Sequence, residues 1–246
     1  AARLDDALER VAHGAAVSVP SILLQRGLTV AFTAVLTNGF AAAPYGLFAL
    51  ARRLQRYLSR IVLGFRSGLS RYLPTAEREE REALATFAAV LLLGVATVFG
   101  AALYLAAPMV TSIAEKGPQF ETLLRVFALG TPASVWLFTT TEVLRGMEKV
   151  GPLNLTLRIA FPAAQLLAGV VGTFLFGSIV AVAVGVLVVM GTVGFGALGY
   201  LYWAEGMRPR LRGGSTDLNL AELRRRYLGF TIPLFLGGFA TTTQRL

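Results

Sequence analysis

Long apolar stretches, each of the length that crosses a lipid bilayer, constrain this chain more than any other feature of its sequence. A membrane-spanning helix needs about 20 predominantly apolar residues. Such stretches lie at roughly 13–37, 45–70, 84–109, 122–145, 153–176 and 179–203, and a seventh opens near Tyr227. We therefore predict an all-α, polytopic membrane protein: a bundle of six transmembrane helices and the start of a seventh.

The predicted division has three parts: a six-helix bundle at 1–203, a cytoplasmic linker at 204–226 and the truncated start of a second bundle at 227–246. The linker is the longest and most polar connection. A small hydroxyl residue, a β-branched residue and a proline open the first span at Ser18 and recur at Thr231. Transporters are often built from repeated bundles. We therefore expect half of a 12–14-helix transporter, whose partner is a second bundle of the same protein.

Composition excludes several classes of function. Only 15% of the residues are charged, whereas a soluble domain has about 25%. The chain has no cysteine, and His13 is its one histidine. We therefore predict no catalytic residues, no metal site, no cofactor and no enzymatic activity. The formal net charge of +9 would suggest nucleic acid in a soluble protein. Here the basic residues lie in short loops and inside spans, so no nucleic-acid partner is expected.

Loop charges predict the orientation in the membrane. Thirteen Lys or Arg residues lie in the N-terminal segment and in the connections on its side, against only Lys116 on the opposite side. Cytoplasmic loops carry such an excess of basic residues. We therefore predict a multi-pass protein of the cell membrane with a cytoplasmic N-terminus.

The second span is unusually rich in arginine. On a helix its cationic residues fall within an arc of about 140°, and the opposite side is built mainly from leucines. The arginines are Arg52, Arg53, Arg56, Arg60, Arg66 and Arg71.

Energetics predict where this cationic side points. An arginine at the bilayer centre that faces lipid costs about 2.5–3.5 kcal/mol, so five would cost on the order of 15 kcal/mol. Glu142 is the one acidic residue inside the six complete spans, so pairing within this chain cannot neutralise the arginines. We therefore expect the cationic side to border an aqueous cavity. Such a cavity concentrates anions, and arginine binds phosphate with two parallel hydrogen bonds.

Three alternatives to a cavity stay open for this segment. It could lie flat on the membrane as an amphipathic helix. It could be a voltage sensor, although sensors space their arginines regularly by three, unlike the spacings here. It could also pair with acids in the second half of the protein or in another subunit.

Other charged residues within spans have simpler interpretations. Arg26 lies in the middle of the first span, where it could anchor to backbone carbonyls or add to the charge of the cavity. Glu142 and Arg158 both lie toward the cytoplasmic ends of their spans, and we predict an ion pair between them. The candidate substrate-binding residues are therefore Arg26, Arg52, Arg53, Arg56, Arg60 and Arg66.

Three short segments resemble a known family in both order and spacing. Residues 43–50 (APYGLFAL) resemble the start of the second helix of polysaccharide flippases, 70–74 (SRYLP) the end of that helix, and 144–149 (LRGMEK) the stretch after the fourth helix. The family is that of the Wzx-type O-antigen and polysaccharide flippases of the multidrug/oligosaccharidyl-lipid/polysaccharide exporter (MOP) superfamily. This chain departs from it in carrying far more arginine in its second span.

The resemblance implies two six-helix bundles around a cationic cavity. That cavity would move a glycan linked to polyprenyl or dolichyl phosphate across the membrane by alternating access. Related lipid II flippases use cavity arginines in their first and second helices, which match Arg26 and the Arg52–Arg60 group by location. The expected partners are thus a lipid-linked anionic glycan and membrane lipid.

Two other functions remain as hypotheses. One is a cation-coupled multidrug exporter of the same superfamily, which generally needs an embedded acid in its N-terminal bundle. The other is a membrane subunit of a glycan-assembly enzyme. That enzyme would need acidic residues at the membrane face, and Glu77–Glu82 is the one such cluster.

Overall fold

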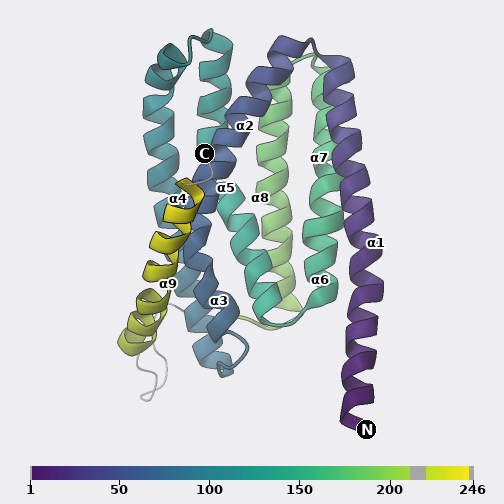
Figure 1. The fold of residues 1–246 in the computed structure, drawn as a ribbon, viewed down its shortest axis with the longest axis vertical. Coiled ribbons are helices and arrows are strands. Elements are labelled where there is room, and N and C mark those ends of the chain that lie inside the picture. Colours follow the sequence, from purple (N-terminus) through teal and green to yellow (C-terminus); the bar gives the residue numbers. More distant parts are fainter. Residues whose placement is uncertain (1, 211–219, 244–246) are drawn as a thin grey trace.

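A computed structural model describes residues 2–210 and 220–243 of the chain, and this part is built from helices without strands (Figure 1). The all-α prediction is confirmed. In chain order the elements are α1 (Ala2–Gly39), α2 (Ala42–Leu63), the 3₁₀ turn η1 (Gly64–Arg66), α3 (Ser67–Tyr72), α4 (Arg78–Ile113), α5 (Pro118–Gly146), α6 (Val150–Asn154), the π segment η2 (Leu155–Ala160), α7 (Phe161–Val170), the π segment η3 (Val171–Leu175), α8 (Ile179–Trp203) and α9 (Leu220–Thr243).

Five helices among the described residues are long and apolar enough to cross a membrane: Val19–Gly39, Arg78–Ile113, Pro118–Gly146, Val150–Leu175 and Ile179–Trp203. These correspond to the first, third, fourth, fifth and sixth predicted spans. The second span is α2, whose 22 residues are long enough to cross but carry four arginines. The structure therefore has the six helices that the apolar pattern predicts.

The second span is not one continuous α-helix, as the range 45–70 implied. The chain tightens into the 3₁₀ turn η1 between α2 and α3. Such a turn changes the partners of nearby carbonyl groups. Two hydroxyl groups supply partners here: Ser67 Oγ donates to the carbonyl oxygen of Gly64 at 3.1 Å, and Tyr227 Oη donates to that of Phe65 at 2.6 Å. A contact from α9 thus holds the break in place.

The fifth span is interrupted by wider turns. Pro162 has no backbone N–H and crowds the preceding turn, so the ordinary α-helical hydrogen bonding cannot continue through it. The π segment η2 lies directly before this proline, between α6 and α7. The distortion that Pro162 imposes on this span is thus taken up as a π segment.

α5 is the central helix of the bundle. It packs against α4, α8 and α2 (Figure 1), and a larger share of it is buried than of any other membrane-length helix described. Its phenylalanines contribute to the largest apolar cluster, in which the Phe48 and Phe127 rings meet edge to face at 5.4 Å between centroids. α1 lies at the edge of the bundle, where it packs mainly against α7 and η2.

The predicted linker 204–226 is described only in part, because residues 211–219 lie outside the described residues. α9 begins at Leu220, within the range assigned to the linker, and continues into the predicted second bundle. Tyr227 is fully buried, and its ring packs edge to face on Phe87 at 5.9 Å. The division at 203 and 226 stays a prediction.

The connections follow the alternation that the spans predict. Those at 73–77, 147–149 and 204–210 lie at one end of the bundle, and those at 40–41, 114–117 and 176–178 lie at the other (Figure 1). Which end is cytoplasmic stays a prediction from the loop charges.

A close crossing of α4 and α5 leads to a stability prediction. A Cβ at Gly100 would lie 2.7 Å from the backbone oxygen of Ala128, which cannot move without shifting α5. We expect Gly100→Ala to lower the free energy of unfolding by about 1–3 kcal/mol, as overpacked sites do. Thermal unfolding in detergent measures the change. Gly94→Ala on the same helix is the matched control, because a Cβ there meets nothing within 4 Å. Equal melting temperatures for the two variants would contradict the prediction.

Candidate functional site

α2 packs on α5 through a narrow buried stripe. The stripe consists of Phe48, Ala51, Gln55, Ser59 and Val62, which recur every three or four residues and so share one side of the helix. The arginines lie along one flank of this stripe and the leucines along the other. The buried stripe between the arginine flank and the leucine flank, rather than the leucine flank itself, therefore contacts the bundle.

Two small residues of α5 let α2 approach closely. A Cβ at Gly130 would collide with Leu187 of α8 and lie 2.9 Å from Gln55 Nε2. One turn further along, Ser134 Oγ donates to Ser59 Oγ at 3.1 Å, and both residues are buried. These contacts fix the rotation of α2 about its own axis and therefore the direction of its arginines.

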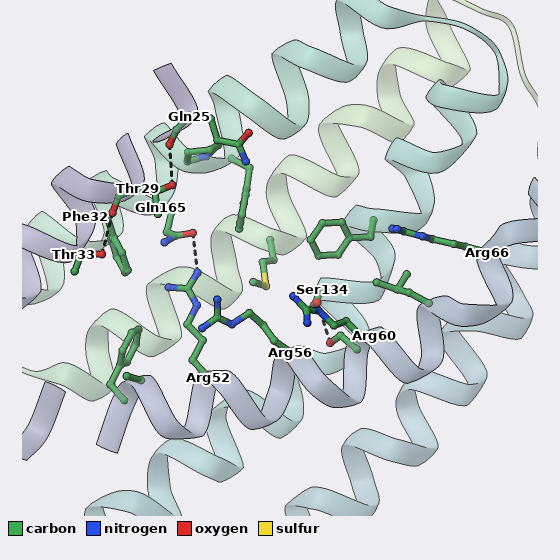
Figure 2. Close-up of a pocket in the computed structure, with 18 of the residues that line it drawn as sticks. Gln25, Thr29, Phe32, Thr33, Arg52, Arg56, Arg60, Arg66, Ser134 and Gln165 are labelled. Atoms are coloured by element: carbon green, nitrogen blue, oxygen red, sulfur yellow. Dashed lines mark hydrogen bonds between the residues drawn. The ribbon is translucent and has the colours of Figure 1, made fainter. Parts of the chain in front are cut away.

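The arginine flank of α2 borders a cavity inside the bundle. The cavity measures about 730 Å³ and is lined by residues of α1, α2, η1, α3, α5, α7 and α8. Four of the predicted site residues line it, namely Arg52, Arg56, Arg60 and Arg66 (Figure 2). We call this space the arginine cavity. Because α2 runs through the bundle, the structure contradicts the alternative of a helix lying flat on the membrane.

Arg52 is the most enclosed of the four arginines. Its Nη2 donates to Gln165 Oε1 of α7 at 2.9 Å, and its guanidinium lies 5.3 Å and 5.8 Å from the ring centroids of Phe32 and Phe48. Its Nε is buried without a hydrogen-bond partner. Gln165 and the two rings are neutral, and no described acidic residue pairs with Arg52, so its positive charge is held in place without being compensated.

Arg56 and Arg60 have no described partner. Both side chains lie along the cavity, and neither forms a hydrogen bond or an ion pair with any residue that the structure describes. Together with Arg53 and Tyr57 they also line a second hollow of about 390 Å³. Arg53 is directed away from the arginine cavity and donates to Tyr57 Oη at 3.2 Å.

α1 supplies a neutral polar wall that the sequence analysis missed. Gln25, Thr29 and Thr33 recur every fourth residue and line the cavity (Figure 2). Thr29 Oγ1 donates to the carbonyl oxygen of Gln25 at 2.8 Å, and Thr33 Oγ1 donates to that of Thr29 at 3.0 Å. A hydroxyl that donates in this way keeps lone pairs free to accept. The sequence signal for this wall was the recurrence of polar residues at every fourth position of an otherwise apolar span.

Arg26 does not line the arginine cavity. It is exposed on α1, one residue beyond Gln25. One residue turns a helix by about 100°, which separates Arg26 from the face that carries Gln25 and Thr29. The structure thus brings four of the six candidate arginines together around the arginine cavity, whereas Arg26 and Arg53 do not line it.

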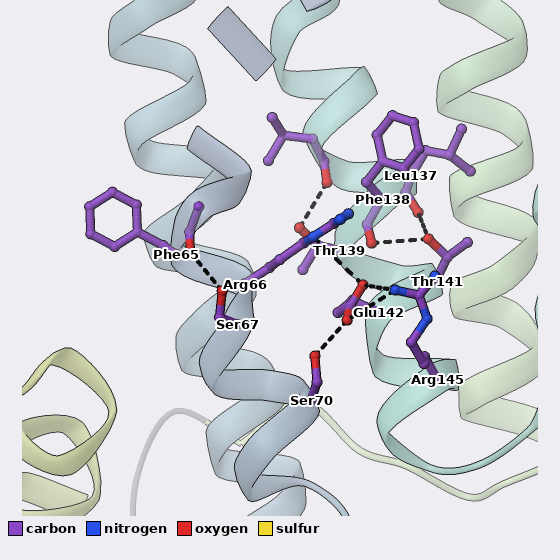
Figure 3. A network of polar contacts seen from close by, with 12 residues as sticks. Phe65, Arg66, Ser67, Ser70, Leu137, Phe138, Thr139, Thr141, Glu142 and Arg145 are labelled. Carbon is purple, nitrogen blue, oxygen red and sulfur yellow. Dashed lines mark hydrogen bonds and ion pairs between the residues drawn. The ribbon is translucent and has the colours of Figure 1, made fainter. Parts of the chain in front are cut away.

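Glu142 forms a cluster of polar contacts that includes Arg66, one of the residues lining the cavity (Figure 3). Its carboxylate accepts from Ser70 Oγ at 2.6 Å and from Arg145 Nη1 at 3.0 Å, and it lies 3.7 Å from Arg66 Nε. Only 4% of its side chain is exposed. The predicted ion pair with Arg158 is wrong, because tertiary packing brings α3 beside Glu142. Arg158 instead donates to Ser21 Oγ at 3.3 Å.

The cavity therefore carries an uneven charge. None of its described lining residues is acidic, and the nearby Glu142 compensates Arg66 at one end. Arg52, Arg56 and Arg60 remain without a described acidic partner. Such a space attracts anions, and its hydrogen-bond donors are already arranged.

Comparisons with known proteins identify the fold. No protein-family model and no curated protein matches this chain. Among solved structures it resembles a MOP superfamily transporter from Pyrococcus furiosus (TM-score 0.64, 16% identity, 94% of this chain and 51% of that one). It also resembles a MATE transporter in complex with MaD3S (0.66, 15%, 94% and 54%) and an outward-facing multidrug resistance MATE transporter (0.60, 14%, 94% and 53%).

The chain thus spans about half the length of the transporters it matches. Its fold resembles that of about half of each of these transporters, which confirms the predicted all-α, polytopic architecture. At these identities the likeness shows the fold alone, and the chemistry of the cavity must be argued from its own residues.

The Glu142 cluster leads to a prediction. Glu142→Gln would leave Arg66 and Arg145 without their carboxylate, and breaking a buried pair costs about 3–5 kcal/mol. Both arginines are partly exposed here, so we expect a smaller loss, of about 1–3 kcal/mol, seen as earlier thermal unfolding in detergent. Glu148→Gln, at an exposed site without a described ion pair, should leave the melting temperature unchanged. An unaltered transition in Glu142→Gln would contradict the structural role of this carboxylate.

Proposed function

We propose that this chain is the half of a membrane transporter that binds the anionic head group of a lipid-linked oligosaccharide and flips it across the cell membrane. The observation that carries the proposal is the arginine cavity, in which Arg52, Arg56 and Arg60 have no acidic partner among the described residues. A phosphate or diphosphate ester fits such a site, because guanidinium groups bind phosphate oxygens in a charge-assisted, bidentate manner.

The spacing of the arginines suits an elongated anion. Arg52, Arg56 and Arg60 follow one another every four residues, so successive arginines are about 6 Å apart along the axis of α2. A diphosphate that bridges two of these arginines would contact two guanidinium groups at once. The same arrangement offers a series of neighbouring sites along the helix, and an anion crossing a membrane needs such sites, each binding it weakly enough to release it.

The other walls suit the rest of such a substrate. Hydroxyl groups of a glycan can donate to the free lone pairs of Thr29 and Thr33 and bond to the amide of Gln25. Phe32 and Phe48 add apolar surface beside Arg52. One cavity therefore combines cationic, neutral polar and apolar surfaces, as a phosphate, a sugar and a lipid together would require.

A multidrug exporter is the alternative with the same fold. The solved MATE transporters have this architecture, whereas the Pyrococcus furiosus protein was described as having a binding pocket of reverse polarity that suggests a different function. An exporter coupled to cations needs an accessible acid in this half. Glu142 is buried and already engaged by Arg66, Arg145 and Ser70. The charge of the cavity therefore favours an anionic substrate.

Translocation by the whole transporter tests the proposal. Reconstituted in vesicles, the protein should move a fluorescent oligosaccharide linked to polyprenyl diphosphate between leaflets. Arg56→Ala with Arg60→Ala should slow this movement at least about tenfold, since each hydrogen bond to a charged group contributes about 1.5–3 kcal/mol. Neither side chain forms a hydrogen bond or an ion pair with a described residue, so the variant should keep its fold.

Arg225→Ala is the matched control, because Arg225 is an exposed arginine of α9 outside the cavity, and the control should translocate at the parental rate. Parental rates in the double variant would contradict the proposal. Transport of cationic dyes in place of the lipid-linked sugar would favour the multidrug exporter.

A further inference from the structure

A second, chemically different groove lies on another side of the bundle. It measures about 230 Å³ and is formed by the first turns of α4, the last turns of α5 and α8, and the segment 207–209. It shares no lining residue with the arginine cavity. We call it the α4–α8 groove.

The groove is elongated along α4 and mostly apolar. Along α4 it extends from Glu82 to Leu93, a distance of about 16 Å at the rise of an α-helix. Ala85, Ala89 and Val90 line it between these two residues. Because α4 crosses the membrane, the groove begins at the end of the bundle near 204–210 and continues into the apolar layer.

The polar end of the groove is arranged so that one positive charge remains available. The buried carboxylate of Glu82 lies 3.6 Å from Arg78 Nε and 3.9 Å from Arg210 Nε, and it accepts from the backbone N–H of Arg208 at 3.2 Å. Its negative charge is therefore compensated. Arg208 is exposed and lines the groove, and its guanidinium has no hydrogen-bond or ion-pair partner among the described residues.

We propose that the α4–α8 groove is a binding site for an anionic phospholipid. One acyl chain occupies the apolar channel between Ala85 and Leu93, and the lipid phosphate binds Arg208. The groove matches such a lipid in both polarity and depth. Arg208 lies at the end of the bundle, where lipid head groups lie, and the apolar channel extends from it along the membrane normal. A basic residue at this depth favours an anionic over a zwitterionic lipid about five-fold.

A tryptophan of the chain can report lipid binding at this site by its fluorescence. Trp136 lines the groove, and the sequence has two tryptophans, of which the other is Trp203 at the end of α8. Trp203 is highly exposed, so Trp203→Phe should leave the fold intact and make Trp136 the single tryptophan. Bromine atoms on an acyl chain quench tryptophan fluorescence only at short range.

The experiment compares two brominated lipids in nanodiscs that hold the Trp203→Phe protein. One is a phosphatidylglycerol and the other a phosphatidylcholine with the same acyl chains, each titrated into non-brominated lipid. We expect half-maximal quenching of Trp136 at about a five-fold lower fraction of the anionic lipid. Equal half-maximal fractions for the two lipids would overturn the proposal.

Two pairs of variants separate the phosphate contact from the acyl channel. Arg208→Gln should abolish the preference for the anionic lipid, whereas Arg225→Gln, at an exposed arginine of α9, should keep it. Ala89→Phe fills the channel and should reduce quenching by both lipids. Ala102→Phe, at an exposed site of α4 outside the groove, should not.

A preference that survives Arg208→Gln would overturn the phosphate contact, and unchanged quenching in Ala89→Phe would overturn the acyl channel. No transported substrate is present in these measurements, so their outcome is independent of the proposed transport function.

Discussion

The positive charge of α2 is the constraint on which the rest of the structure depends. A guanidinium group at membrane depth is stable only next to water or a partner of opposite charge, and four arginines turned toward lipid would cost on the order of 10 kcal/mol. The contacts of α2 with α5 meet this constraint. Close approach at Gly130 and the bond between Ser59 and Ser134 orient the helix, so that Arg52, Arg56 and Arg60 border the cavity.

The same constraint explains the polar groups around the cavity. Gln165 and two aromatic rings hold Arg52 without neutralising it, and Glu142 compensates Arg66 where α2 gives way to α3. The positive charge is therefore left uncompensated around Arg52 and is compensated at the end of the cavity that contains Arg66. The 3₁₀ turn that carries Arg66 is also the place where Tyr227 of α9 binds the backbone. The same short turn thus carries a charged residue of the cavity and a packing contact with α9.

Apolar length and charge periodicity predicted most of this fold. The sixth span matched α8 at both ends because its apolar run is uninterrupted and ends in polar residues. The break at Gly64 could not be predicted, since it depends on a hydroxyl group 162 residues away along the chain from Phe65. Ser70 and Arg66, two of the three partners of Glu142, escaped prediction for the same reason, because both are more than 70 residues away along the chain. The periodicity of α2 grouped its arginines correctly on one side, but only the contact with α5 decides that Arg53 turns away from the cavity.

The most direct test of the account is the water accessibility of α2, and the absence of cysteine from the chain makes it simple. Single cysteines at positions 56, 60 and 50 would be exposed in membranes to thiol reagents that cannot cross the bilayer. The account predicts that Arg56→Cys and Arg60→Cys react, and faster with an anionic than with a cationic reagent, whereas Leu50→Cys on the leucine flank stays unmodified. Protection at positions 56 and 60 together with modification at position 50 would show that the arginines do not border water, and it would contradict the account.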